Sequence, residues 1–206
     1  MLLYHHRITV HHYLYGEDML ILEGPDGGGK TTLAHKLSED LGLPLHKRAS
    51  DSVTGPVVDL YAWTVDDLTT WHQQPLAIYD RHPLTSEHIY GPAVRGNTRP
   101  GFELGNPDIS YMRRYLRKHA VVIICLPPFG VVQENVASEI EQMPGVVENI
   151  EHIYECYRMM LHVWPMDSQI ARYDYTANEN DVTAYQSILA ACLHHKHTWR
   201  SVPYVG

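Results

Sequence analysis

Residues 19–41 read MLILEGPDGGGKTTLAHKLSEDL, which joins an apolar strand, a glycine-rich loop and the first turns of a helix. Residues 24–31 of this run match the pattern G-x4-G-K-[ST] in full. Glycines let backbone N–H groups converge on phosphate oxygens because no Cβ atoms stand in the way. The helix that follows contributes the positive end of its dipole. The run therefore predicts a loop that binds phosphate, and a chance glycine-rich turn is the alternative that this context disfavours.

The side chains of this loop have separate expected roles. Lys30 is expected to reach the β- and γ-phosphates of a nucleoside triphosphate, and the Thr31 hydroxyl is expected to bind Mg²⁺. ATP and Mg²⁺ are therefore the expected cofactors. The residues expected to contact the phosphates are Gly24, Asp26, Gly27, Gly28, Gly29, Lys30, Thr31 and Thr32.

The rest of the chain alternates short apolar strands with longer amphipathic helices. The continuous apolar run at 121–126 is typical of a strand buried on both faces of a parallel sheet. Such alternation predicts a single α/β domain in which helices cover both faces of a parallel sheet, and the glycine-rich loop makes the expected fold of the P-loop NTPase type. Strands are expected at residues 20–22, 76–79, 121–126 and 171–175, and helices at 31–41, 108–119, 147–164 and 181–193, with a partly helical stretch at 57–73.

Two segments fall outside this alternation. Residues 1–18 hold aromatics and four histidines without a clear period, and they are expected to be an N-terminal extension, non-native or disordered, ahead of a domain at 19–206. An edge hairpin is the alternative, because Ile8, Val10 and Leu14 lie on an even spacing. Residues 91–107 are rich in Gly, Pro and Asn, and are expected to form a long loop or lid.

The overall composition limits the classes of partner and compartment. The formal net charge is −8 and no long basic run is present, which disfavours DNA or RNA as a partner. No run of about 18 apolar residues occurs, so no membrane span is expected. Three cysteines without CxxC spacing indicate a reduced, cytoplasmic setting. The many histidines lack the spacing of a helical zinc motif and are expected at the surface.

An acidic residue closes the second apolar strand. Residues 76–80 read LAIYD, so Asp80 would stand at the carboxyl end of that strand, where ligands of open parallel sheets bind. From there Asp80 would bind the metal or its water, or accept a proton from an attacking hydroxyl. A structural aspartate in a strand-end turn is the alternative.

The segment DRHPLTSEHIYG at residues 80–91 resembles the Asp-Arg segment of thymidylate kinases and deoxynucleoside kinases. Together with the glycine-rich loop, it makes the chain similar to that group of P-loop kinases, and phage-encoded relatives of thymidylate kinase are the nearest likeness. In layout the resemblance extends over roughly residues 19–195, although only these two segments are specific. It implies that Arg81 contacts an acceptor phosphate or the region of the substrate hydroxyl, for which a planar guanidinium is suited. An ordinary ion pair with a nearby carboxylate is the alternative for Arg81.

The chain departs from that group in one respect. Such kinases usually carry an arginine-rich lid after the fourth strand, but residues 127–150 contain no Lys or Arg. Arg95 or Arg99 in the Gly/Pro loop, or Arg158 on the helix at 147–164, are the candidate replacements, and a solvated helix face is the alternative for Arg158. Four aromatic residues are candidates to stack on a base, although such rings more often belong to the core: Trp63, Trp71, Tyr90 and Phe102.

The resemblance implies an ATP-dependent phosphotransferase that acts on a nucleoside or a nucleoside monophosphate. One alternative is a kinase of another acceptor, such as a modified base in DNA, which the acidic charge disfavours. The other is a P-loop ATPase or nucleotide-binding switch without an acceptor. The expected partner is a small nucleoside or nucleotide, and a homodimer is a further expectation. The catalytic candidates are Lys30, Asp80 and Arg81; the metal candidates are Thr31 and Asp80; the substrate candidates are Arg81, Tyr90, Arg95, Arg99, Phe102 and Arg158.

Overall fold

The computed structural model describes residues 19–46, 50–51, 55–56, 59–70, 77–139, 142–164, 169–177, 185–186 and 189. The expectations for residues 1–18, for Trp71 and for most of the helix at 181–193 lie outside these ranges. The helices are α1 (Lys30–Leu41), α2 (Leu60–Thr70), α3 (Pro83–Tyr90), the π-helix η2 (Gly91–Arg95), α4 (Pro107–His119), α5 (Phe129–Ser138) and α6 (Val146–Val163). The strands are β1 (Met19–Glu23), β2 (Ser50–Asp51), β3 (Gly55–Pro56), β4 (Ile78–Asp80), β5 (Ala120–Cys125) and β6 (Gln169–Tyr173).

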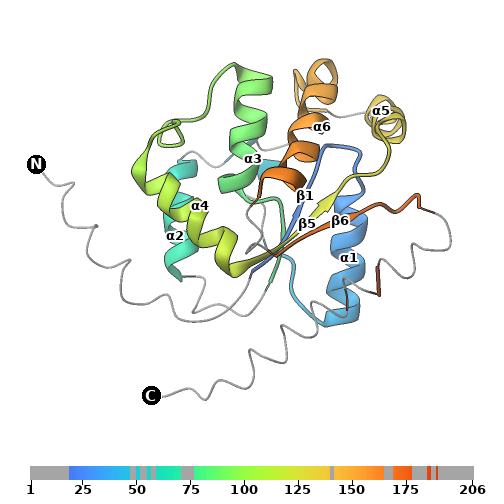
Figure 1. The fold of residues 1–206 in the computed structure, drawn as a ribbon, viewed down its shortest axis with the longest axis horizontal. Helices are drawn as coiled ribbons and strands as arrows, with labels where there is room; N and C mark the ends of the chain where they lie inside the picture. The colour runs from blue at the N-terminus through green and yellow to red at the C-terminus, as the bar shows by residue number, and fades with distance from the viewer. Residues whose placement is uncertain are drawn as a thin grey trace, which may run out of the picture.

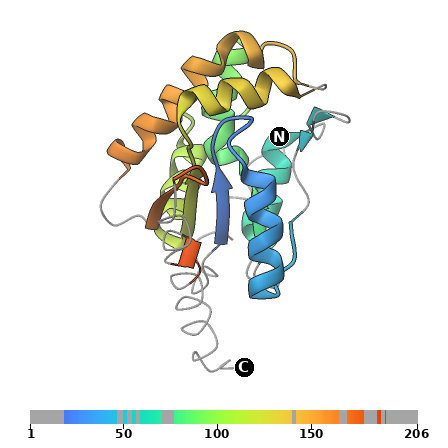
Figure 2. The ribbon, with the colours of Figure 1, turned by 90° about the vertical axis from the view of Figure 1, so that its right-hand side faces the viewer.

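The main sheet is parallel throughout and has the strand order β4-β1-β5-β6 (Figures 1 and 2). Leu22 of β1 lies opposite Asp80 of β4 on one side and opposite Ile123 of β5 on the other. A single parallel bridge between Leu45 and Ile78 extends the sheet beyond β4. Because all of these strands run the same way, their carboxyl ends meet at one edge, where the glycine-rich loop begins.

The two faces of the sheet are buried against different helices. Leu20 and Leu22 pack with Leu33 and Leu37 of α1. The alternate residues of β1, such as Ile21, pack into a second core that includes side chains of α2, α3, α4 and α6. In Figure 1, α1 accordingly lies across the strands from α3 and α4. The expected α/β fold, with helices on both faces of a parallel sheet, is confirmed.

The element boundaries largely follow the sequence pattern. The helix expected at 31–41 spans Lys30–Leu41 and ends at Gly42, whose left-handed backbone closes it. The apolar run expected at 121–126 forms β5, and every residue of that strand is buried. No described helix is long and apolar enough to cross a membrane.

The segment at 91–107 is only in part the expected long loop or lid. It begins with the π-helix Gly91–Arg95, which continues directly from α3. Farther along, the ring of Phe102 is fully buried and packs edge-on against Tyr61. The Glu87 carboxylate accepts a hydrogen bond from the Arg99 N–H at 2.7 Å. An apolar anchor and a buried carboxylate thus hold this segment to the domain, which composition alone did not indicate.

Candidate active site

The glycine-rich loop follows a path that side chains would block. Gly24 has φ +137°, and a Cβ atom there would lie 2.3 Å from the carbonyl oxygen of Cys125 at the end of β5. Gly29 has φ +82° and caps α1 without any side-chain hydrogen bond. The amides at the start of α1 therefore have no side-chain cap, which is the arrangement that binds phosphate oxygens at helix N-termini.

Lys30 lies within this loop rather than in solvent. Its side chain is buried and its ammonium donates a hydrogen bond to the Pro25 carbonyl across the loop. Burial, together with the nearby Arg81, lowers the pKa of Lys30 to about 8, against the opposing effect of Asp26 and Asp80. A buried ammonium of this kind gains from an added anion, because the anion replaces the water that burial removed.

The two candidate metal ligands, Thr31 of α1 and Asp80 of β4, come together at the carboxyl edge of the sheet. The Thr31 hydroxyl donates to the Asp80 carboxylate at 3.2 Å, so a residue of α1 meets the last residue of β4. Hydroxyl and carboxylate oxygens are ligands that Mg²⁺ prefers, and in nucleotide sites the phosphates complete its shell. Within the described ranges, no group of three or more His, Cys, Asp or Glu side chains could hold a metal by itself. The pair therefore fits a nucleotide-bound Mg²⁺ rather than a metal cage built of protein alone.

Arg81 turns back toward the loop from the end of β4. Its backbone is left-handed, with φ 68°, the one such non-glycine residue in the part of the chain that the structure describes. That conformation costs roughly 1–2 kcal/mol for a residue with a Cβ atom. The guanidinium donates to Asp26 at 2.8 Å and to the Gly24 carbonyl at 3.2 Å. The expected alternative of an ion pair is thus present, and it joins the Asp-Arg segment to the phosphate loop.

Asp26 and Tyr90 complete this cluster. Burial favours the neutral acid, but Arg81 and Lys30 outweigh it and hold the pKa of Asp26 at about 2. The Tyr90 hydroxyl donates to Asp26 at 2.9 Å, and the Arg81 guanidinium lies 4.4 Å from the centre of the Tyr90 ring. Tyr90 is therefore occupied by the loop and by Arg81, and its buried ring is not free to stack on a base.

Two further substrate candidates are corrected by the structure. Phe102 is 0 % exposed and belongs to the core, so its ring presents no surface to a ligand. Arg158 forms an ion pair with Glu155 on α6, and 49 % of its side chain is exposed. Because Arg158 pairs with Glu155 on the solvated face of α6, it does not point inward as a replacement for a lid arginine. The sequence pattern could not separate the two faces of this helix at that position.

Arg95 and Arg99 both lie by Glu87. The Arg95 guanidinium forms an ion pair with the Glu87 carboxylate, and Arg99 reaches the same carboxylate through its backbone N–H. Trp63, the remaining described stacking candidate, is partly buried and lies in a T-shaped arrangement with the ring of His46. Neither arginine is seen bound to the phosphate loop, so a role toward substrate stays a prediction for both.

Sequence reasoning missed Glu23, the last residue of β1. Its carboxylate is fully buried and accepts a hydrogen bond from the His82 N–H at 2.9 Å and another from the Tyr157 hydroxyl at 2.9 Å. Burial raises its pKa to about 7, although His82, Arg81, Tyr157 and Lys30 all act to lower it. The available signal was an acid that ends an apolar strand immediately before the glycine-rich loop.

A pH-dependent stability follows from the raised pKa of Glu23. Between its ordinary pKa of 4.5 and the folded value of about 7, the folded chain holds a proton that the unfolded chain has released. Stability is therefore lost as pH rises through this window, by at most about 3 kcal/mol. Glu23→Gln removes this contribution, so its unfolding free energy relative to wild type is expected to rise from pH 4.5 to pH 7 and then level off.

Urea unfolding at several pH values measures this difference. Glu151→Gln, which changes an exposed carboxylate on α6, is the control and is expected to show no such rise. A difference between the Glu23 variant and wild type that stays constant with pH would mean that Glu23 titrates normally.

Asn135 of α5 is a second contact that the sequence did not reveal. Its amide donates to the Gly27 carbonyl at 2.8 Å and to the Tyr175 hydroxyl at 2.7 Å. The Tyr175 ring packs against Gly29, where an added Cβ atom would lie 2.9 Å from the ring carbons. The loop is thus supported from the α5 side and from the segment after β6, which are far apart in sequence.

Comparison with known proteins identifies the fold. No protein-family model matches the chain, and no curated protein matches it either. Among solved structures, YorR protein from Bacillus subtilis in complex with phosphorylated GDP is 21% identical, with a TM-score of 0.61 over 87% of this chain and 98% of that one. Deoxyadenosine kinase from M. mycoides is similar in two states, with products dCMP and dCDP (15% identical, TM-score 0.59, 85% of this chain and 98% of that one) and with bound dATP (14% identical, TM-score 0.55, 85% and 99%).

At these identities the similarity establishes a shared fold. The chain shares the fold of these proteins, and its glycine-rich loop occupies the carboxyl edge of the parallel sheet.

Proposed function

We propose that the protein is an ATP-dependent phosphotransferase whose acceptor is a nucleoside or a nucleoside monophosphate. The observation that carries the proposal is the meeting of Thr31 and Asp80, 3.2 Å apart, beside the buried ammonium of Lys30. Phosphoryl transfer needs positive charge, a metal site and a proton acceptor near the moving group, and these residues are suited to those tasks. The proposed catalytic domain is residues 19–206, acting in the cytoplasm.

Each residue has a defined part in the proposed reaction. The loop amides and Lys30 bind the β- and γ-phosphates, and Thr31 and Asp80 hold the metal. When bound, Mg²⁺ neutralises the charge of the phosphates. Asp80 also accepts the proton of the attacking hydroxyl in this proposal, while Arg81, which donates to Asp26 and to the Gly24 carbonyl, contacts the acceptor. Asp26 fixes the direction of the Arg81 guanidinium through their ion pair.

The structural neighbours support this choice of acceptor. One of them is a deoxyadenosine kinase, whose structures hold dATP in one case and dCMP and dCDP in the other. Arg81 and Arg95 are each paired with a carboxylate in the present structure. An uncharged nucleoside needs less free positive charge from these arginines than a nucleoside monophosphate does, because it adds no negative charge to the site.

A coupled assay of ADP release tests the proposal. ADP release is expected to stay near background with ATP and Mg²⁺ alone, and to rise about tenfold or more when the correct acceptor is present. The panel contains the common deoxynucleosides, ribonucleosides and their monophosphates, with single-stranded and duplex DNA in separate wells. Turnover that needs no acceptor would instead indicate an ATPase, and transfer to DNA alone would indicate a base kinase; either result contradicts the proposal.

A further inference from the structure

We propose that Asp67 of α2 is a positioning residue, which holds the residues on both sides of Asp80–Arg81 and so fixes these two side chains beside the phosphate loop. The inference rests on the proposed function for its kinetic consequence but not for its structural one. In chain order α1, β2 and β3 lie between the glycine-rich loop and the helix α2 that carries Asp67, and neither motif in the sequence includes this residue.

The turn after β4 needs support from outside itself. Arg81 is left-handed, a backbone conformation that persists only where surrounding contacts hold it. Its N–H donates to the Leu22 carbonyl at 2.9 Å, which fixes the turn on the side of β1. Whatever fixes the neighbouring residues therefore also determines where Asp80 and Arg81 point.

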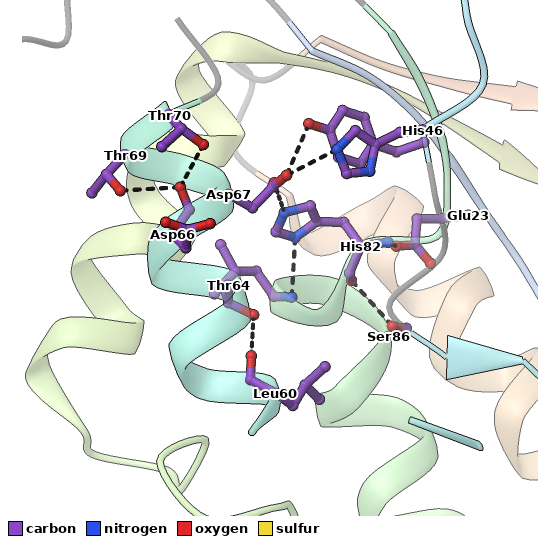
Figure 3. A network of polar contacts seen from close by, with 12 residues as sticks. Glu23, His46, Leu60, Thr64, Asp66, Asp67, Thr69, Thr70, His82 and Ser86 are labelled. Carbon is purple, nitrogen blue, oxygen red and sulfur yellow. Dashed lines mark hydrogen bonds and ion pairs between the residues drawn. The ribbon is translucent and has the colours of Figure 1, made fainter. Parts of the chain in front are cut away.

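His82, the next residue, is fully buried and held at three points. Its Nδ1 accepts a hydrogen bond from the Leu84 N–H at 3.2 Å, which caps the start of α3. A nitrogen that accepts carries no proton, so the proton belongs on Nε2, which lies 3.4 Å from an oxygen of Asp67. The His82 backbone N–H donates to Glu23 at 2.9 Å (Figure 3). Two carboxylates thus hold this one residue, one at the ring and one at the backbone.

Tyr79, the residue before Asp80, is held by the same carboxylate. Its hydroxyl donates to Asp67 at 3.2 Å. The imidazole of His46 lies 3.2 Å from the same oxygen and stacks on the Tyr79 ring with 4.2 Å between ring centres. Asp67 therefore bridges Tyr79 and His82, and Asp80 and Arg81 are the two residues between them.

The burial of Asp67 indicates a role in geometry rather than in stability. The residue is 4 % exposed, and its described partners are two imidazoles and one phenol. A buried carboxylate loses its hydration, and an apolar side chain of similar size would often stabilise the same position better. The carboxylate instead orients its partners, because its two oxygens accept hydrogen bonds from Tyr79 and His82 in fixed directions. In Figure 3 its side chain points from α2 toward His46 and His82.

Asp67→Asn tests the inference, with Asp66→Asn as the matched control. Asp66 is the adjacent residue of α2 and is exposed, so its substitution changes the same charge without touching the bridge. The first measurement is hydrogen exchange of peptides that contain residues 78–87, which requires no substrate. The His82 amide is expected to exchange about tenfold faster in the Asp67 variant, because the ring no longer holds it against Glu23, and to be unchanged in the Asp66 variant.

The second measurement is kinetic, with the acceptor found by the ADP-release panel. Asp67→Asn is expected to lower kcat by about 10- to 100-fold through misplacement of Asp80 and Arg81, while ATP affinity stays within about threefold because the loop itself is intact. In an Arg81→Ala background the same substitution is expected to lower kcat much less, since one of the groups it positions is already gone.

Several results would overturn the inference. They are an unchanged exchange rate at His82, a kcat equal to that of the Asp66 variant, or full additivity with Arg81→Ala. Tyr79→Phe, which removes only a hydroxyl, supplies a second variant if Asp67→Asn fails to fold, and it is expected to lower kcat in the same direction. A panel without any active acceptor would refute the proposed function, and the exchange experiment would still decide the role of Asp67.

Discussion

Lys30→Ala is expected to reduce acceptor-dependent turnover by about 10³-fold or more while the fold remains intact. The ammonium is the main positive side chain inside the loop, and the transferred phosphoryl group needs such charge as it moves. In the structure this ammonium is buried and donates a hydrogen bond to the Pro25 carbonyl, so it lies within the loop where a phosphate would bind. The loss is expected mainly in kcat, with weaker ATP binding as a second effect.

Two further variants separate lost chemistry from lost folding. Lys36→Ala, an exposed site on the same helix, is the control and is expected to retain activity. Lys30→Met keeps a side chain of similar length without the buried charge, so its melting temperature without nucleotide should equal or exceed that of wild type. ATP with Mg²⁺ should then raise the melting temperature of wild type but hardly that of the variant. Normal turnover in either Lys30 variant would show that the loop does not bind the reacting phosphates.

Asp80→Asn is expected to lower kcat by about 10²- to 10⁴-fold, because it removes both a metal ligand charge and a proton acceptor. The carboxylate lies at the carboxyl end of β4 and meets the Thr31 hydroxyl at 3.2 Å. Asparagine keeps the size and one oxygen, so the sheet and the turn should survive. Steady-state kinetics with the acceptor from the panel measures the effect.

Titration with Mg²⁺ divides the two roles of Asp80. If the carboxylate mainly holds the metal, higher Mg²⁺ concentrations should restore part of the lost rate. If it mainly accepts the proton, the loss should persist at saturating Mg²⁺ and rise with acceptors whose hydroxyl is less acidic. A kcat within twofold of wild type at every Mg²⁺ concentration would assign Asp80 a structural role only.

The parts of the site that the sequence predicted are local in the chain. The glycine pattern and Lys30 lie within one short run, so spacing alone indicated their geometry. Asp80 was found because parallel strands end at one edge of the sheet, and the pairing of Leu22 with Asp80 bears out that placement. A local spacing rule was sufficient for the loop, and a rule of sheet topology was sufficient for Asp80.

The parts that the sequence did not predict depend on contacts between distant segments. Glu23 meets His82 and Tyr157, and the last of these is 134 positions away along the chain. Asp67 looked like one of two adjacent acids on a helix, and only the packing of α2 against the turn after β4 distinguishes it from Asp66. Asp67 does fall on the buried stripe of α2 with Leu60, Thr64 and Leu68, but this period does not indicate which partners a buried carboxylate meets.

Two of the substrate candidates that the structure does not support have the same origin. Phe102 lies in a run rich in glycine and proline, which predicted a long loop or lid, and its ring takes the alternative place, the core. Arg158 stands on an amphipathic helix at a position where periodicity did not settle the face, and Glu155 one turn earlier takes its charge. Where a residue lies between the buried and the exposed face of a helix, nearby charged residues determine which way its long side chain points. A hydrophobic pattern does not include such charges.

The binding of a triphosphate by the loop at residues 24–31 is the claim on which every role above depends. A crystal structure with a non-hydrolysable ATP analogue and Mg²⁺ tests it most directly. The account predicts phosphate oxygens within hydrogen-bond distance of the loop amides and of Lys30 Nζ, with the metal beside Thr31 and Asp80. A triphosphate bound elsewhere, or loop amides turned away from it, would contradict the account.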